Sequence, residues 1–260
     1  MAPSLDDIAT ELVAEQQRLD DLVSPLGEGE WSRPCIVGPW TIRAQVAHLA
    51  DSERLATLAA TDEAAFAEAL AQAIANSERL EAGDPPDLTG LEPAALLEQW
   101  RLRRRATVNA VLERGQQSRI PWVTGSLSSR SFLTARLMET WAHSQDVHDA
   151  LGATHAESNA LLHVAHLGVA TRAFSFGNRG LEPPADDLRV ELVAPDGTIW
   201  AWGPPGAGGS VEGPAVDFCL VVTRRRHVDD TGLSATGGAR RWLDIAQAFA
   251  GPPVDPARWP

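Results

Sequence analysis

The chain has 260 residues, 44% of them hydrophobic, and a formal net charge of −13. Non-specific nucleic-acid binding depends on cations that neutralise phosphates, and anionic lipid headgroups repel a negative surface, so we expect neither nucleic acid nor a membrane as a partner. All 22 basic residues are arginine, and tyrosine is also absent. Chemistry that needs a lysine amine, such as a Schiff base or a Walker-type phosphate loop, is therefore excluded.

Helical spacing of apolar residues, together with capping and stop signals, predicts helices throughout the first two-thirds of the chain. Ser4 and Thr41 are the expected N-caps of the first two helices, and Gly115 and Gly152 mark the ends of two later ones. The segment between the first two helices is expected to be a loop. The predicted helices cover residues 4–24, 41–60, 62–80, 92–115, 131–152 and 156–176.

Composition changes near GNRGLEPPADD, residues 177–187. After it, LRVELVAP and TIWAW are alternating runs joined by Asp-Gly, which is a strong hairpin signal. A third short strand is expected at residues 208–213, followed by helices at 214–226 and 238–250 and a coil tail. The sequence therefore predicts an α+β protein, with a helical bundle over residues 1–155 and a connecting helix and small α+β domain over residues 156–260.

No apolar stretch reaches the roughly 18 residues that a membrane-spanning helix needs. The first residues, MAPSLDDIATELVAEQQ, are acidic and amphipathic, whereas a signal peptide has a basic head and an apolar run, so we expect no signal peptide. The two cysteines, Cys35 and Cys219, give no disulfide framework and are expected to be packing residues. These features predict a protein of the reducing cytoplasm.

The segment RLMETWAHSQDVHD carries the candidate chemistry. Glu139 and His143 are four residues apart and project side by side from a helix, with Arg136 one turn before them and Asp146 one turn after. Such a pair can bind a divalent metal ion inside a helical bundle. The pattern also arises by chance as a surface ion pair, so both interpretations stand.

A third ligand would favour the metal. His48 lies mid-helix in AQVAHLAD, where a solvated histidine is not expected; the alternative is a core histidine satisfied by one hydrogen bond. Three protein ligands with an open position are typical of a catalytic metal site.

The remaining histidines fit this site less well. His148 lies about 140° around the helix from His143, and His163 and His166 are expected to pack or to lie at a domain interface. His155 and His227 fall near helix ends, where solvation or a contact with the helix dipole suffices. The run of arginines at residues 224–226 could reach an anionic ligand or form a solvated helix end.

Taken together, GPWTIRAQVAHLAD and ARLMETWAHSQDVHDALG resemble the DinB-like metal-binding superfamily, and within it the mycothiol-dependent maleylpyruvate isomerase-like proteins of actinobacteria. The pattern there is a tryptophan-led helix with one histidine, here Trp40 and His48, followed by Arg-x-x-Glu-x-x-x-His-x-x-Asp on the last bundle helix. The resemblance covers roughly residues 1–155. It extends more loosely to the end, since such proteins often carry a C-terminal domain similar to sterol-carrier proteins.

The resemblance implies a four-helix bundle that holds a divalent metal, zinc in the isomerase, through His48, Glu139 and His143. It implies that a low-molecular-weight thiol, mycothiol, reaches the open position and reacts with a small electrophilic substrate, in an isomerase or a thiol S-transferase. Arg136 could then orient a carboxylate of substrate or thiol, or form an ion pair with Asp146 or another acid. Asp146 would hold a ligand histidine in the correct tautomer.

Two further functions stay open. The metal could activate water in a zinc-dependent hydrolase, or it could be structural in a non-catalytic protein that binds a small molecule or lipid. The substrate is not identified by the sequence. The oligomeric state, for which a homodimer is one option, is also left open.

Overall fold

The computed structural model describes residues 3–36, 40–75, 88, 90–123 and 125–254. The chain divides into two compact units, Met1–His155 and Ala156–Pro260. Within the described part of the chain, no helix is long and apolar enough to span a membrane.

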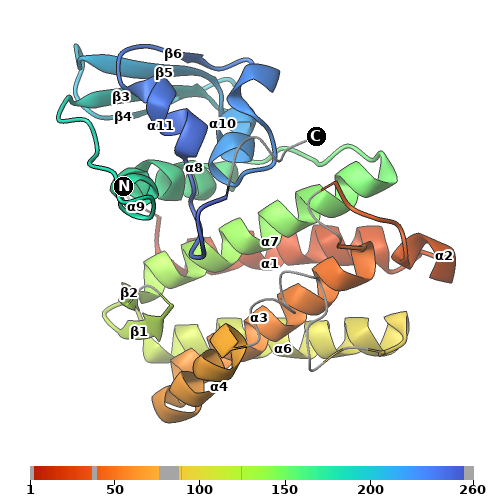
Figure 1. The fold of residues 1–260 in the computed structure, drawn as a ribbon. Helices are drawn as coiled ribbons and strands as arrows, with labels where there is room; N and C mark the ends of the chain where they lie inside the picture. Colours follow the sequence, from red (N-terminus) through yellow and green to blue (C-terminus); the bar gives the residue numbers. More distant parts are fainter. Residues whose placement is uncertain (1–2, 37–39, 76–87, 89, 124, 255–260) are drawn as a thin grey trace. The chain divides into compact units, whose positions relative to one another are not determined.

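The first unit is built on four long helices (Figure 1). They are α1 (Leu5–Val23), α3 (Ile42–Thr61), α6 (Pro93–Arg114) and α7 (Ser129–Leu151). Helix α3 packs against α6 and α7, and α1 packs against the same two helices. Apolar side chains from all four helices meet in one buried cluster, which includes Leu19, Ile42, Leu96, Trp100 and Val147. The bundle therefore places α3 and α7, the two helices with the candidate ligands, in direct contact.

The helix ends follow the predicted capping signals. Ser4 Oγ accepts a hydrogen bond from Asp7 N, and the Asp7 carboxylate accepts one from Ser4 N, which completes a capping box. Thr41 Oγ1 accepts from Ala44 N at the start of α3. Gly152 ends α7 in the left-handed conformation, with φ of 64°, where a side chain would be strained. These predictions are confirmed.

Among the described residues, the first unit also contains two smaller helices and a hairpin, which were predicted less well. The expected loop between the first two helices contains a short helix, α2 (Glu28–Trp31). Helix α4 (Glu63–Ala75) confirms most of the alanine-rich helix predicted at 62–80, whose last residues lie outside the described part. Strands β1 (Arg119–Trp122) and β2 (Gly125–Ser128) form an antiparallel hairpin that was not predicted. Pro121 and the serine-rich second strand give almost no β signal.

The second unit is a small sheet covered by helices. Its strand order is β4-β3-β5-β6, in which β3 pairs antiparallel with β4 and parallel with β5. The strands are β3 (Leu188–Val193), β4 (Ile199–Trp202), β5 (Gly209–Pro214) and β6 (Ser234–Ala235). The Asp-Gly hairpin and the third strand are thus confirmed, whereas the two-residue β6 was missed.

The helices of the second unit are shorter than predicted. They are α8 (Leu161–Ala170), α9 (Arg172–Gly177), α10 (Ala215–Val222) and α11 (Ala239–Ile245), with a 3₁₀ turn at Val228–Asp230. The single helix expected at 156–176 is wrong: it begins five residues later and breaks at Thr171. The Thr171 hydroxyl donates to Leu167 O and Gly168 O, and such bonding to the preceding turn bends helices. Helix α10 contacts β3 and β5, and α11 contacts β5. The α+β fold class is confirmed.

Candidate metal centre

The structure brings His48, Glu139 and His143 together between α3 and α7. His48 Nε2 lies 2.8 Å from Glu139 Oε1, and His143 Nε2 lies 3.5 Å from the same oxygen. One ligand atom from each residue lies within 4.8 Å of the others. Glu139 and His143 share one face of α7 as their spacing predicts, and the packing of α3 against α7 supplies His48. The described residues contain no other group of three potential ligands this close.

The donor set fits a divalent transition metal. Two imidazole nitrogens and one carboxylate oxygen are common zinc ligands, at about 2.0–2.2 Å each, which places donors of a tetrahedral shell about 3.3–3.5 Å apart. The separation between His143 Nε2 and Glu139 Oε1 matches that spacing. The contact between His48 and Glu139 is shorter, as expected for a direct hydrogen bond. Three protein donors leave a tetrahedral ion with one position for a guest.

Solvent reaches all three side chains. The exposed fractions are 26% for the His48 side chain, 21% for Glu139 and 14% for His143. Trp40 lies against both histidines, with its ring centroid 4.9 Å from that of His48, edge to face, and 5.7 Å from that of His143, stacked. The cluster therefore has an aromatic wall and an accessible side, which a site for small-molecule chemistry needs.

Glu139 remains ionised in this environment. Burial raises its pKa, but hydrogen bonds from His143 and His48 lower it by more. The positive charge of Arg136 lowers it further, so the pKa lies well below its ordinary value. A carboxylate that carries its charge is the form that binds a cation.

The structure shows one partner of His143 that was not expected from the sequence. Its Nδ1 lies 2.5 Å from Gln45 Oε1, across the interface between α3 and α7. Asp146, which was predicted to orient a ligand histidine, has Oδ2 3.7 Å from the same nitrogen. Gln45 precedes His48 by three residues, so a search for polar residues one helical turn from a candidate ligand could have found it.

Arg136 lies one turn before Glu139, and its side chain is only 3% exposed. It donates to Ser52 Oγ at 2.8 Å, and its Nε lies 3.9 Å from Glu53 Oε1. Of the two alternatives for an ion pair, the partner is thus another acid, Glu53, and Asp146 is not the partner. Arg136 Nε and Nη2 and Glu53 Oε2 have no hydrogen-bond partner among the described atoms. The buried pair is therefore incompletely satisfied.

Two predictions for residues outside this cluster are wrong. His155 was expected to be solvated or to contact a helix dipole, but its side chain is 5% exposed and its Nε2 lies 2.9 Å from Glu15 Oε1. The arginines at 224–226 were expected to be solvated or to reach a ligand. Arg224 and Arg225 are instead buried, and their guanidinium groups donate to backbone carbonyls of Asp244 and Thr223. Both cysteines are buried, as expected of packing residues.

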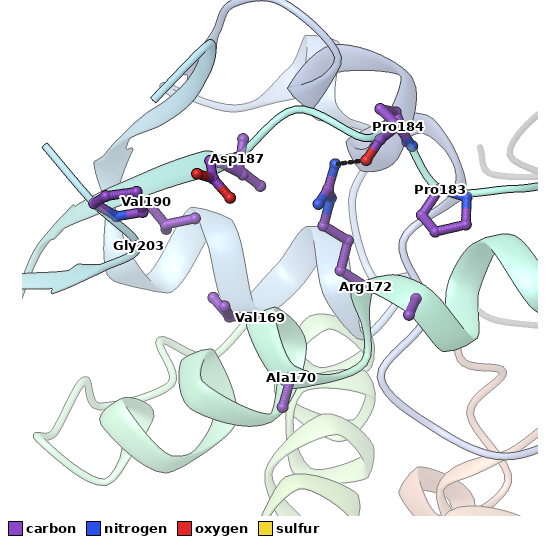
Figure 2. Close-up of a pocket in the computed structure, with 11 residues that line it drawn as sticks. Val169, Ala170, Arg172, Pro183, Pro184, Asp187, Val190 and Gly203 are labelled. Carbon is purple, nitrogen blue, oxygen red and sulfur yellow. Dashed lines mark hydrogen bonds between the residues drawn. The ribbon is translucent and has the colours of Figure 1, made fainter. Parts of the chain in front are cut away.

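A pocket of about 390 Å³ lies within the second unit. Val169 and Val190 contribute apolar walls, and Figure 2 shows the Arg172 guanidinium between Pro184 and Asp187. Arg172 Nη2 donates to Pro184 O at 3.3 Å, the dashed contact in Figure 2. The volume lies within the range of small-molecule pockets. The pocket has no group of metal-ligating side chains among its lining residues.

These features define a class: a four-helix bundle with two histidines and a glutamate on facing helices, followed by a small α+β unit. The sequence model of the mycothiol maleylpyruvate isomerase N-terminal domain matches residues 12–148, which is more than half of the chain. The chain belongs to this family, and the resemblance noted from its motifs is confirmed.

The chain is also similar to proteins of known sequence and to proteins of known structure. Uncharacterized proteins from two strains of Mycobacterium tuberculosis are 43% identical over 244 residues, which covers 94% of this chain and 95% of each relative. Crystal structures of the mycothiol-dependent maleylpyruvate isomerase and of a histidine-to-alanine mutant of it give TM-scores of 0.58 and 0.57. They are 16% and 18% identical and cover 91% of this chain and 94% of the solved one, so they share its fold.

Proposed function

We propose that this protein is a mycothiol-linked metalloenzyme, an isomerase or a thiol S-transferase, that acts on a small electrophile. His48, Glu139 and His143 would hold the metal, with zinc as the expected ion. The observation that carries the proposal is the convergence of two imidazoles and one carboxylate within 4.8 Å of one another on facing helices. Family membership supports the link to mycothiol.

A zinc ion in this position would lower the pKa of a bound thiol, so that the nucleophilic thiolate forms near neutral pH. Glu139 contributes one negative charge and the histidines none when neutral, so the three side chains leave a divalent ion with a net positive charge. That charge favours an anionic guest. Trp40 limits access of water on one side of the cluster. Both cysteines of the chain are buried, so the thiol is expected to come from outside the protein.

Arg136 and Asp146 belong to the same proposal as supporting residues. Arg136 places a positive charge next to Glu139, and its Nε and Nη2, which have no partner among the described atoms, could donate to a carboxylate of substrate or thiol. Its contact with Glu53 favours the alternative, in which it is a structural charge within the bundle. Asp146 adds a carboxylate near His143 Nδ1.

Metal analysis of the purified protein tests the proposal directly. The wild-type chain should bind one zinc ion, and His48→Ala and Glu139→Gln should each lose it, because two donors hold the ion far less tightly than three. His166→Ala, which changes an exposed histidine of the second unit, is the matched control and should keep full zinc content. A His48→Ala variant with wild-type zinc content would rule out this site.

A thiol-conjugation screen then separates the reactions. With maleylpyruvate and related electrophiles as probes, turnover should require mycothiol and be absent with the metal-free protein. Turnover without any thiol would instead indicate a hydrolase that uses metal-bound water.

The pocket of the second unit favours a second candidate function, binding of a small, largely apolar molecule. Its apolar walls suit such a molecule, and Arg172 and Asp187 place one charge of each sign on the lining for a polar group of the ligand. Mass spectrometry of an organic extract of the purified protein should then recover a copurified ligand. An extract without a copurified ligand, together with turnover that depends on zinc and thiol, would support the enzyme and exclude the binding function.

A further inference from the structure

Gln45 is a buried residue in close polar contact with a proposed metal ligand on a different helix. Its side-chain oxygen lies 2.5 Å from His143 Nδ1, and the residue is 1% exposed. It precedes His48 by three residues on α3, so it lies one helical turn from another proposed ligand. A single helix thus supplies one ligand and contacts the ligand of the facing helix.

The surroundings of His143 determine which ring nitrogen carries the proton. Nδ1 lies 2.5 Å from Gln45 Oε1 and 3.7 Å from Asp146 Oδ2. An ionised carboxylate only accepts hydrogen bonds, and an amide oxygen also only accepts. Nδ1 is therefore the donor. With Nδ1 engaged by Gln45, Nε2, which lies 3.5 Å from Glu139 Oε1, is the ring nitrogen left to bind a cation.

We propose that Gln45 is a positioning residue for the metal centre. By accepting the Nδ1 hydrogen of His143 it fixes the tautomer and the ring orientation in which Nε2 can bind a cation. The inference rests on the proposed metal site and assigns a role that the motif itself does not contain. Histidine ligands generally donate their second ring N–H to such an acceptor, and its loss weakens metal binding.

The geometry assigns this role to Gln45 in preference to Asp146. Only the Gln45 contact is within hydrogen-bond distance, since 3.7 Å is beyond the usual limit. Gln45 is also buried, so water has little access to replace its oxygen if the side chain is shortened or made apolar. An amide acceptor adds no charge, which leaves the net positive charge of the loaded site intact.

Zinc affinity, measured by competition with a chromogenic chelator, tests the inference. Gln45→Leu should bind zinc about 10- to 100-fold more weakly than the wild type, whereas Gln45→Glu, which restores an acceptor of the same length, should recover most of the affinity. Gln16→Leu is the matched control: Gln16 is an equally buried glutamine of the same bundle that contacts Glu53 and none of the three ligands. It should bind zinc as the wild type does.

The visible spectrum of the cobalt(II)-substituted proteins reports on the geometry of the ligands, and a general loss of stability would not change it. Gln45→Leu should change the intensity of the cobalt bands, because the His143 ring loses its fixed orientation, while Gln16→Leu should not. Asp146→Asn should weaken zinc binding less than Gln45→Leu does.

The possible results distinguish a failure of the proposed metal site from a failure of the role of Gln45 alone. A wild-type chain that binds no zinc overturns the metal centre and this inference with it. Zinc binding by the wild type and equally by Gln45→Leu overturns the role of Gln45 alone, and so does a larger loss in Asp146→Asn. Should Gln45→Leu fail to fold, Gln45→Glu decides: wild-type affinity and cobalt spectrum support the role, and a loss of both refutes it.

Discussion

The ion pair between Glu15 and His155 gives the strongest stability prediction. Glu15 lies mid-way along α1 with its side chain 1% exposed. Its Oε1 lies 2.9 Å from His155 Nε2, and its Oε2 accepts from Arg18. His155 Nδ1 faces Gln145 Oε1 at 3.0 Å, so both ring nitrogens face acceptors. Glu15→Gln removes the carboxylate charge from the contacts with His155 and Arg18.

The expected cost follows from the two contacts. A hydrogen bond to a charged group is worth about 1.5–3 kcal/mol when it is buried. The Arg18 side chain is 31% exposed, so that contact is screened and adds at most about 1 kcal/mol. We therefore expect Glu15→Gln to lower the free energy of unfolding of the first unit by about 3 kcal/mol. This is a large fraction of the roughly 5–15 kcal/mol that stabilises a typical domain.

Urea unfolding followed by far-ultraviolet circular dichroism measures this loss, since the helices lie mainly in the first unit. With an m-value of about 2 kcal/mol/M, the midpoint should fall by about 1.5 M. Glu11→Gln, one turn earlier on α1 and not buried, is the control and should change the midpoint little. Equal midpoints for the Glu11 and Glu15 variants would refute the reasoning.

The contacts of Glu15 with His155 and Arg18 also determine how the stability that Glu15 contributes changes with pH. Burial raises the pKa of Glu15, but His155 and Arg18 lower it by more, so it lies below its ordinary value of 4.5. A depressed folded-state pKa adds stability that is fully present above the unfolded-state pKa and is lost as the pH falls through the folded-state value. The difference between the wild type and Glu15→Gln should thus be widest near neutral pH and narrow below about pH 4.5.

Two further predictions concern the second unit. In α8, a Cβ on Gly168 would lie 2.8 Å from Val222 Cγ2. Gly168→Ala should therefore lower the melting temperature of this unit, because overpacking costs about 1–3 kcal/mol and outweighs the gain in helix propensity. Gly177→Ala is the control and should not lower it, because the space around Gly177 is open. Equal melting temperatures for the two variants would contradict the predicted overpacking. Burial raises the pKa of Cys219 well above its ordinary value. Iodoacetamide should therefore not modify this thiol in the native protein and should modify it once denaturant is added. Rapid labelling of Cys219 in the native state would contradict its burial.

Local signals in the sequence predicted most of the fold. Ser4 and Thr41 cap their helices as expected, and the Asp-Gly turn joins β3 to β4. The incorrect predictions concern segments whose structure is determined by side-chain and tertiary contacts. The β1–β2 hairpin contains Pro121 and few β-branched residues, and it is held by packing against α3 and α7. The break at Thr171 depends on a side-chain hydrogen bond that helical periodicity does not encode.

The candidate site was predictable to the extent that it lies on one helix. The spacing of Glu139 and His143 is enough to place them side by side, and the apolar context of His48 indicated burial. Contacts that cross helices were not predictable, because they depend on the relative rotation and axial position of α3 and α7. Gln45 therefore replaces Asp146 as the near partner of His143, and Glu53 replaces it beside Arg136.

The pKa values of two carboxylates close to Arg136, Glu53 and Glu139, shift in opposite directions. The two shifts indicate which of the two carboxylates carries the negative charge. Burial raises the pKa of Glu53, and the charge of Arg136 offsets only part of that effect. For Glu139, hydrogen bonds from the two histidines reverse the effect of burial and the pKa falls. Glu139 also raises the pKa of Glu53 by repulsion. These directions favour Glu53 as the carboxylate that takes up a proton and leave the anionic charge on Glu139, the carboxylate that contacts His48 and His143.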